Sequence, residues 1–257
     1  MAAWDLVTCQ GDVFHVGPRE LSRIERAALA QHGTWIRRWS ALLPVRLRDR
    51  RADSPLTPAS PDLGTGLELL ESAGRPFVEG LVETCLAASA PDGPRRPRVL
   101  DLGGGHGAYA LGFARRGCPT TLQDLPAVID HARRDDRLAT AGIELVAGDA
   151  FTEPAPGPFD LVLCGTLTNL FELNRVHELL ARIRDSLAPG GRVAIATWLR
   201  DRGPVGAAFG VQMLVATPHG DAHGENDYRQ ALAATGYGDV QVAEVGEPAL
   251  ALIMARR

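Results

Sequence analysis

Short apolar runs alternate with longer amphipathic segments from about residue 97 to the end of the sequence. The short runs are rich in Val, Leu and Ile, as buried strands are, and the longer segments repeat apolar residues at helical spacing. The pattern predicts strands at 98–102, 118–123, 143–149, 159–165 and 192–198. It predicts helices at 108–116, 126–134, 172–187, 205–216 and 226–236, and a terminal hairpin of 239–245 with 249–255. Strands that alternate with helices in this way predict an α/β fold with a doubly wound, mostly parallel sheet.

Residues 1–90 follow a different pattern. A hairpin is expected at 6–17, one or two helices at 19–43, and a Pro/Ser-rich connector at 50–66. This is little material for an independent core, so we expect a small, mainly helical region that packs on the α/β domain of residues 91–257 or on another chain. Its expected roles are association and covering a substrate pocket.

The composition limits the classes of binding partner that we expect. The formal charge of −4 includes no basic excess, so neither a nucleic acid nor a membrane surface is expected, and a small-molecule substrate fits better. No run approaches the ~20 apolar residues of a membrane span. The N-terminus also lacks the apolar segment of a signal peptide, so a cytoplasmic location is expected.

The absence of lysine and the spacing of the cysteines exclude several kinds of catalytic or metal site. All 27 basic residues are arginines, and the absence of lysine excludes a Walker-type phosphate loop and a Schiff-base enzyme. The four cysteines stand singly at Cys9, Cys85, Cys118 and Cys164. This spacing fits neither a zinc site nor a disulfide framework, so we expect reduced thiols and no metal.

A glycine-rich stretch, "VLDLGGGHGAYALGFARR" at 99–116, follows the first predicted strand and leads into a helix. Glycines at this point let backbone N–H groups and a helix N-terminus approach a ligand without a β-carbon in the way. A dinucleotide site spaces its glycines as GxGxxG. Here Gly103, Gly105 and Gly107 stand at every second position behind Asp101. That spacing is wrong for a pyrophosphate and places an acid at the end of the strand.

Two more acids end the next two predicted strands. Asp124 follows the second strand and can accept hydrogen bonds from both hydroxyls of a ribose. Asp149 ends the third, where its carboxylate and the backbone of Ala150 and Phe151 can meet an adenine. Each acid alone could be a helix N-cap or a solvated strand end. Three acids at three successive strand ends point to one ligand, because ligands of open α/β sheets bind at the carboxyl edge.

Several segments together resemble a known family. They are "VLDLGGGHG", "LQDLPAVI", "GDAF", "LLARIRDSLAPGGRVAIA" and "QMLVATPHG...DYRQALAATGY". They are similar to the catalytic half of class I S-adenosylmethionine-dependent O-methyltransferases of the hydroxyindole, plant phenolic and bacterial polyketide tailoring type, from about residue 95 onward. The resemblance implies a Rossmann-like fold and S-adenosylmethionine as cofactor. It implies cofactor contacts from Asp101, Gly103, Gly105, Gly107, Asp124, Leu125, Asp149, Ala150, Phe151 and Cys164.

The sequence departs from that family at the expected general base. Relatives carry a His-Asp-Trp triplet after the fourth strand, where this chain has Asn169, Leu170 and Phe171. Asparagine cannot take the proton, although it can orient a substrate, so base catalysis worth typically 10²- to 10⁴-fold is missing from that position.

Other bases are available in the loop "PHGDAHGEND". His219, His223 and Asp227 are candidates there, and Asp227 stands where the family places a histidine-orienting glutamate. The two histidines also suggest a metal site, but the glycine-broken stretch fits a solvated loop better. His106, inside the glycine loop, either faces the methionine end of the cofactor or fills the loop.

The second departure concerns the N-terminus. Relatives carry further helices that interlock two subunits, whereas this sequence begins close to the predicted hairpin. Apolar surface left open in this way predicts association, either with itself or with a small partner protein.

Four functions follow from these features. The leading hypothesis is a methyltransferase that acts on a small secondary metabolite in natural-product biosynthesis. The alternative is a protein of the same fold that no longer methylates and instead catalyses a cyclisation or elimination on a natural-product intermediate. A non-catalytic subunit that regulates a partner enzyme comes third, and an NAD-dependent dehydrogenase last.

Overall fold

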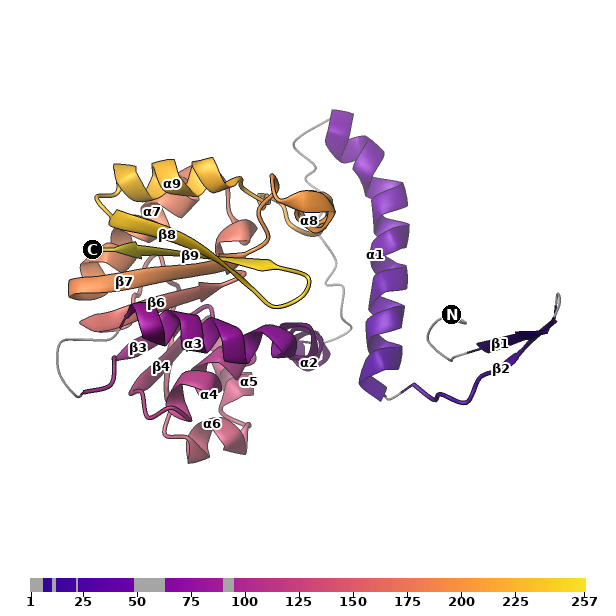
Figure 1. Ribbon diagram of the computed structural model, residues 1–257, viewed down its shortest axis with the longest axis horizontal. Helices are drawn as coiled ribbons and strands as arrows, with labels where there is room; N and C mark the ends of the chain where they lie inside the picture. Colours follow the sequence, from indigo (N-terminus) through magenta and orange to yellow (C-terminus); the bar gives the residue numbers. More distant parts are fainter. Residues whose placement is uncertain (1–6, 11–12, 22, 49–62, 90–94) are drawn as a thin grey trace.

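A seven-stranded sheet forms the body of the molecule in the computed structural model, which describes residues 7–10, 13–21, 23–48, 63–89 and 95–257 (Figure 1). The strands are β3 (Val99–Leu102), β4 (Thr120–Asp124), β5 (Glu144–Ala147), β6 (Phe159–Gly165), β7 (Leu187–Thr197), β8 (Gly238–Val245) and β9 (Leu250–Arg256). Their order across the sheet is β5-β4-β3-β6-β7-β9-β8, and the pairs from β5 to β7 are parallel. Strand β9 is antiparallel to both of its neighbours. The predicted α/β class, mostly parallel sheet and terminal hairpin are confirmed.

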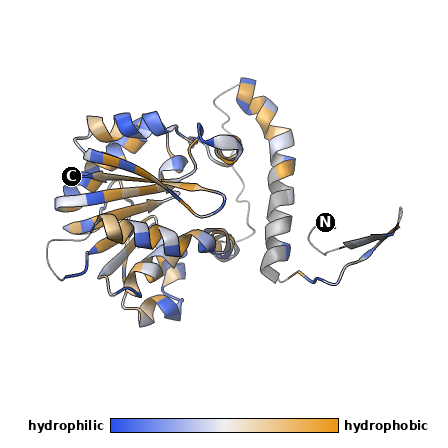
Figure 2. Cartoon of the chain, in the orientation of Figure 1, coloured by the Kyte–Doolittle hydropathy of each residue, from blue (hydrophilic) through white to orange (hydrophobic). Residues whose placement is uncertain are grey.

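Helices cover both faces of this sheet. They are α3 (Val78–Ala88), α4 (Ala108–Ala114), α5 (Pro126–Ala132), α6 (Asp136–Thr140), α7 (Leu173–Ser186), α8 (Gly203–Ala216) and α9 (Glu225–Ala234). Figure 1 shows α7 and α9 on one face and α3 and α4 on the other. The strands between them carry many of the hydrophobic residues of the described chain (Figure 2).

Strand β6 shows why the apolar runs became buried strands. Successive side chains of a strand point to opposite faces, so a strand covered on both faces is apolar throughout. Leu161 and Leu163 pack in the cluster under α3, and Val162 and Cys164 pack in the cluster under α7 and α9. All four residues are fully buried.

Most predicted boundaries differ from the structure by one or two residues, and the short helix α6 was not predicted. The largest difference is in β7, which begins at Leu187, so the segment "APGG" between a predicted helix and a predicted strand belongs to the strand. Leu187 pairs with Phe159 across a register shift in β6, and this pairing extends the strand. Strand β5 ends at Ala147, which places Asp149 in the turn after it.

The N-terminal region contains more helix than the sequence predicted. The hairpin of β1 (Val7–Gln10) and β2 (Val13–Val16) is confirmed, and α1 (Arg23–Arg48) is one continuous helix. Helix α2 (Leu63–Gly74) and a 3-10 turn (Arg75–Phe77) then lead into α3. Within the predicted connector 50–66, residues 63–66 are helical and the others lie outside the described residues.

Helix α3 packs directly on the sheet. Its Leu81, Val82 and Cys85 are fully buried in the same cluster as Leu161 and Leu163. The division of the chain at residue 90 stays a prediction about domains, but this helix before the division shares the core of the sheet that follows it.

Helix α1 and the first hairpin lie at the opposite end of the molecule from the C-terminus (Figure 1). Trp39 of α1 donates a hydrogen bond from Nε1 to Oε1 of Gln212 in α8 at 2.9 Å. Ile36, Val45 and Leu47 of α1 remain 64%, 47% and 71% exposed. Large apolar side chains on one helix therefore face away from the sheet.

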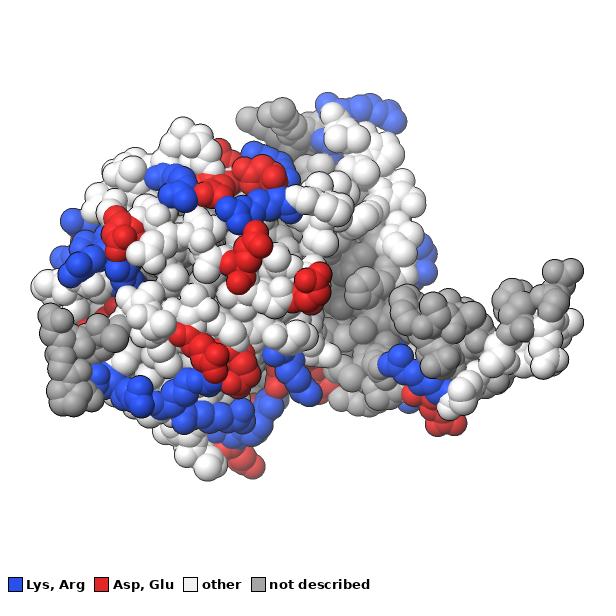
Figure 3. All heavy atoms as spheres, viewed as in Figure 1, with Lys and Arg blue, Asp and Glu red and all other residues white. Residues whose placement is uncertain are grey.

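The surface drawn in Figure 3 carries acidic and basic side chains side by side. Arg202 pairs with Glu225 and Glu244, and Arg229 also pairs with Glu225. No helix within the described residues is both long and apolar enough to cross a membrane.

Candidate functional site

The carboxyl ends of β3, β4 and β5 are tied together by short hydrogen bonds. The amide of Gly103 donates to the carbonyl oxygen of Gln123 at 2.8 Å, and the amide of Gly148 donates to the carbonyl oxygen of Asp124 at 3.0 Å. The Oδ2 atom of Asp124 accepts a third bond, from the amide of Gly105 at 2.9 Å. The loop after β3 and the turn after β5 therefore meet on either side of Asp124.

The glycine loop needs its glycines for conformation and for space. Gly103, Gly105 and Gly107 have φ values of 68°, 51° and 74°, in the left-handed region. A β-carbon at Gly107 would stand 2.7 Å from Cδ2 of Leu138. The loop backbone is therefore bare for a packing reason as well as for access to a ligand.

Asp101 is fully buried beside this loop. Its Oδ2 accepts a hydrogen bond from the amide of Ala110 at 3.0 Å, and its Oδ1 is buried without a partner among the described residues. Burial raises the pKa of Asp101 to about 7; the Ala110 hydrogen bond opposes this shift and the charge of Asp124 adds to it. A buried carboxylate with one free oxygen favours a cationic donor as its partner.

Asp124 is held by the backbone on both of its oxygens. Oδ1 accepts from the amide of Leu125 at 2.7 Å, and Oδ2 from the amide of Gly105. Burial raises the pKa of its carboxyl, and the two backbone hydrogen bonds oppose that shift. Each carboxylate oxygen has a second lone pair, so the fixed group can still accept hydrogen bonds from a ligand. Leu125 beside it is 53% exposed.

The turn after β5 is fixed by Asp149, whose Oδ1 accepts from the amide of Phe151 at 2.8 Å. The Phe151 ring is buried edge-on against Phe171, with the guanidinium of Arg175 3.9 Å from its centroid. The ring therefore belongs to the core, and Ala150, half-buried, precedes it.

Cys164, the last of the predicted cofactor contacts, is fully buried on β6. Burial raises the pKa of its thiol far above the ordinary range. The next residue, Gly165, lines a cavity beside the glycine loop. We name it the loop cavity; it has a volume of about 120 Å³. Its lining residues are Leu70, Ala73, Gly74, Phe77, Asp101, Gly103, Gly104, Gly105, His106, Tyr109, Gly165, Thr166, Trp198 and Leu250.

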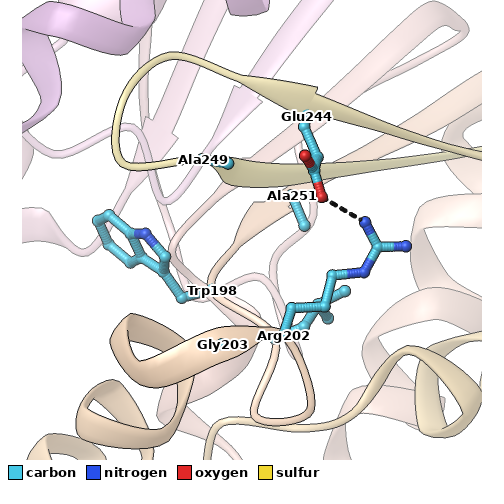
Figure 4. Close-up of a pocket in the computed structure, with 7 residues that line it drawn as sticks. Trp198, Arg202, Gly203, Glu244, Ala249 and Ala251 are labelled. Carbon is cyan, nitrogen blue, oxygen red and sulfur yellow. Dashed lines mark hydrogen bonds and ion pairs between the residues drawn. The ribbon is translucent and has the colours of Figure 1, made fainter.

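A second, larger hollow lies on the other side of β9 (Figure 4). This outer hollow of about 330 Å³ is lined by Trp198, Leu199, Arg202, Gly203, Glu244, Ala249 and Ala251. The Trp198 ring lies at one end and the 2.9 Å ion pair of Arg202 with Glu244 at the other. Trp198 borders both spaces. Of the three predicted acids, Asp101 lines the loop cavity, Asp124 accepts a hydrogen bond from its lining residue Gly105, and none lines the outer hollow. The loop cavity is therefore the candidate site.

The catalytic candidate Asn169 is buried, with 2% exposure. Its Nδ2 donates to Sδ of Met213 in α8 at 3.0 Å, and its Oδ1 is buried without a partner among the described residues. Its backbone oxygen accepts from the amide of Asp221. Asn169 thus holds the loop after α8 against the end of β6.

The other three candidates have structural partners. Asp227 accepts from the amide of Gly224 at 2.8 Å and pairs with Arg200. His219 is exposed, 3.5 Å from Glu172. His223 is 4% exposed and hydrogen-bonded through Nε2 to the carbonyl oxygen of Phe171, so the prediction of a solvated loop is wrong for this histidine. The described lining of the loop cavity includes none of the four candidates.

The sequence offered no signal for several lining residues. Four come from α2 and the turn after it, a helix that the sequence pattern did not predict. Thr166 has a φ of 51°, unusual for a β-branched residue, which only coordinates reveal. Trp198, a large aromatic residue at the end of a predicted strand, could have been found. Its ring packs against Phe77 at 5.9 Å and Phe209 at 5.1 Å between centroids.

Comparisons with known proteins identify the family of the chain. Residues 82–238 match the family model of an O-methyltransferase domain. The chain is 30% identical over 185 residues to the 3-amino-4-hydroxybenzoate 4-O-methyltransferase of Streptomyces cremeus, covering 69% of this chain and 48% of the relative. It is 28% identical over 171 residues to the tetracenomycin polyketide synthesis 8-O-methyl transferase of Streptomyces glaucescens, covering 63% of this chain and 50% of the relative. The chain spans about half the length of these curated relatives.

Solved structures share the fold. Human N-acetylserotonin methyltransferase in complex with SAM superposes with a TM-score of 0.79 at 23% identity, covering 100% of this chain and 80% of that chain. The sheet order and the helices on its two faces are those of the class I methyltransferase fold. The family match extends over more than half of the sequence. The chain therefore belongs to the O-methyltransferase family.

Proposed function

We propose that this protein binds S-adenosylmethionine at the carboxyl edge of its sheet and transfers the methyl group to a small molecule. The observation that carries the proposal is the meeting of Asp101, Asp124 and the Asp149 turn around a bare glycine loop. Three acids without a neighbouring lysine suit a ligand that has an ammonium group and ribose hydroxyls but no phosphate. When bound, this cofactor supplies an electrophilic methyl group on a sulfonium.

Each part of the cofactor has residues that fit it. The free Oδ1 of Asp101 suits the ammonium group of the methionine end. Asp124, fixed by two amides, suits the ribose hydroxyls. Leu125 and the turn of Asp149, Ala150 and Phe151 suit the adenine. Gly103 and Gly105 line the loop cavity beside Asp101, whereas Gly107 turns the chain into α4.

The acceptor in this proposal is a small natural-product intermediate with an aromatic hydroxyl or amine. The names of both Streptomyces relatives describe methylation of a hydroxyl on a small molecule. The aromatic rings of Phe77, Trp198 and Phe209 beside the loop cavity offer flat apolar surface for such a molecule. A cytoplasmic location stays a prediction of the sequence.

Asn169 restricts the nucleophile. Because asparagine takes no proton, the acceptor has to be nucleophilic already, as an acidic phenol or a neutral amine is at neutral pH. Methyl transfer then depends mainly on in-line positioning of the two reacting atoms. We expect acidic phenols and amines to react, and alcohols not to react.

The test is a transfer assay with deuterium-labelled S-adenosylmethionine and a panel of substituted phenols and amines, including 3-amino-4-hydroxybenzoate, analysed by mass spectrometry. Labelled product from acidic phenols or amines supports the proposal. Cofactor binding with no labelled product from any acceptor, at any pH from 6 to 9, would contradict methyl transfer.

That second outcome would favour the alternative function, a cyclisation or elimination in which the cofactor has only a structural role. Two observations support keeping it. Asn169 is buried against Met213, and none of the other three catalytic candidates borders the loop cavity in the described chain. Conversion of an acceptor without label transfer, in the presence of S-adenosylhomocysteine, would distinguish it.

We also propose that the protein associates, either with a second copy or with a small partner protein. Two-stranded hairpins are marginal alone in water, and β1 with β2 stands apart from the sheet (Figure 1). Ile36, Val45 and Leu47 of α1 add exposed apolar surface to the same end of the molecule.

A further inference from the structure

We infer that His106 and Tyr109 form a neutral two-donor cradle for the carboxylate group at the methionine end of the cofactor. The inference rests on the proposed function, because it assigns a partner to the one charged group of that ligand that the three acids cannot bind. Two neighbouring residues of the glycine loop and the start of α4 supply the donors, and Gly74 of α2 leaves room between them.

The size of the loop cavity fits this part of the ligand. Its volume of about 120 Å³ is smaller than the roughly 300–1,000 Å³ of sites for whole small molecules. The short amino-acid end of the cofactor suits this space better than the whole cofactor does. The nucleoside then lies outside the cavity, toward Asp124 and the turn after β5.

The protons of His106 can be placed from its contacts. The amide of Ala108 donates to Nδ1 of His106 at 3.2 Å, so in the neutral ring the proton is on Nε2. Burial lowers the pKa of His106 and keeps the ring neutral. Nε2 is therefore a hydrogen-bond donor on the cavity side and not a base.

Tyr109 supplies the second donor. Burial raises the pKa of its hydroxyl to about 12, so the group keeps its proton. Its Oη and the Nε2 of His106 each lie 3.8 Å from the point where a β-carbon on Gly74 would stand. The two donors thus converge on one small space, which is open because residue 74 has no side chain.

The described residues that line the cavity include neither Arg nor Lys. None of them is therefore a cationic side chain that could bind the carboxylate in place of the two donors. Arg137 is close enough to influence His106, but it is held by Glu71 at 2.8 Å and by Asp135 at 2.7 Å. Asp101 lines the same cavity, and its oxygen without a partner suits the ammonium group. A zwitterion therefore finds an acid and the two neutral donors of the cradle in the same space.

The experiment measures affinities by calorimetry for S-adenosylhomocysteine and for its decarboxylated analogue, which lacks only the carboxylate. His106→Phe is expected to weaken S-adenosylhomocysteine about 10- to 100-fold and the analogue less than about twofold, because hydrogen bonds to charged groups are strong. Tyr109→Phe is expected to act in the same direction. His106→Gln, which restores an N–H donor, is expected to recover most of the loss.

Two further variants separate the cradle from a packing effect. Gly74→Val fills the shared space and keeps both donors; the backbone at Gly74 is right-handed, with φ −78°, so the substitution is compatible with folding. It is expected to weaken S-adenosylhomocysteine. Trp198→Phe removes another N–H donor that borders the cavity, and the ratio of the two affinities is expected to stay unchanged.

If His106→Phe leaves the ratio of the two affinities unchanged, whether or not both ligands bind more weakly, the cradle is overturned. This holds even if the wild type binds both ligands well. If the wild type binds neither ligand, the proposed function fails and the cradle fails with it. Thermal unfolding of each variant without ligand identifies a variant that has lost its fold, and Gly74→Val then supplies an independent result.

Discussion

The carboxylate of Asp124 accepts a hydrogen bond from the amide of Gly105 at 2.9 Å, across the gap between the ends of β4 and β3. These residues are 19 positions apart in the sequence, and the bond fixes the glycine loop and the carboxylate relative to each other. A second bond, from the amide of Leu125, holds the other oxygen. Two backbone amides therefore fix the orientation of the Asp124 carboxylate without any ligand.

Replacing Asp124 by Asn is expected to lower the affinity for S-adenosylhomocysteine about 10- to 100-fold, because a charged acceptor for the ribose is lost. Calorimetry measures the change. Asp130→Asn is the matched control, since Asp130 is exposed on α5 and forms an ion pair with Arg133. Equal affinities of the two variants would contradict the role of Asp124.

The affinity for S-adenosylhomocysteine is expected to rise as the pH increases from 6 to 8. Burial raises the pKa of Asp101 to about 7, so its carboxyl ionises in this range and then attracts the ammonium group. Asp124 is the neighbouring acid, while burial keeps Tyr109 and Cys164 protonated. A pH series of calorimetric titrations tests this, and Asp101→Asn is expected to bind weakly and without the rise.

The same group makes the stability of the ligand-free protein depend on pH. In the unfolded chain Asp101 ionises near 3.8, and in the folded chain near 7, so the folded state binds more protons between these values. The free energy of unfolding contributed by this group therefore falls as the pH rises from about 4 to about 7. Urea unfolding compared between the wild type and Asp101→Asn isolates this contribution; parallel pH profiles would contradict it.

Gly107→Ala is expected to destabilise the protein by about 2–4 kcal/mol, because the left-handed backbone and the contact of the new β-carbon with Leu138 act together. Leu138 is 1% exposed and has little room to move. Gly142→Ala is the control: its φ is also left-handed, at 68°, and nothing lies within 4 Å of its β-carbon position. It is expected to lose only about 1 kcal/mol. Equal losses in urea unfolding would show that crowding at Gly107 is unimportant.

Asn169→His is expected to increase the methylation rate of weakly acidic phenols by at least about 10-fold, because it restores a base at the position where relatives carry one. Acidic phenols, which are already ionised, are expected to gain little. Asn169→Gln controls for a larger side chain beside Met213. A rate increase of the same size for both classes of phenol, or none for the weakly acidic class, would contradict the assignment.

The exposed apolar side chains of α1 predict that the particle in solution is heavier than one chain. Light scattering at micromolar concentration is expected to give more than the 27.4 kDa of one chain, or to do so once a small partner protein is added. Replacing Ile36 and Leu47 by Glu is expected to reduce the association, because both side chains are exposed. A wild-type monomer that no partner protein enlarges would contradict association.

The sheet could be predicted from the sequence because its strands have a clear apolar pattern. Strand β6 has the predicted bounds of 159–165. Asp101 is the second-last residue of β3, and Asp124 is the last residue of β4. Their convergence follows from the rule that ligands bind at the carboxyl edge of a parallel sheet. The segment at Leu187 was misassigned because a Pro-Gly-Gly sequence usually ends a helix, and here pairing with Phe159 overrides it.

The part of the loop cavity lined by α2 and the following turn, and the hydrogen-bond donors of the cavity, could not be predicted in this way. Helix α2 was not predicted, and Gly74 and Phe77 reach the glycine loop from more than 20 residues away in sequence. The tautomer of His106 depends on a backbone contact to Ala108 that has no sequence signal. His223 was expected in solvent because glycines surround it, but the carbonyl of Phe171 binds it in the interior.

The most direct test is a calorimetric titration of the wild-type protein and Asp124→Ala with S-adenosylhomocysteine. If the cofactor binds at the carboxyl edge beside Asp101, Asp124 and Asp149, the wild type binds saturably at one site per chain. The affinity of the variant is then at least about 10-fold lower. Absence of binding in the wild type, or equal binding by both proteins, would contradict the assignment of the carboxyl edge as the cofactor site.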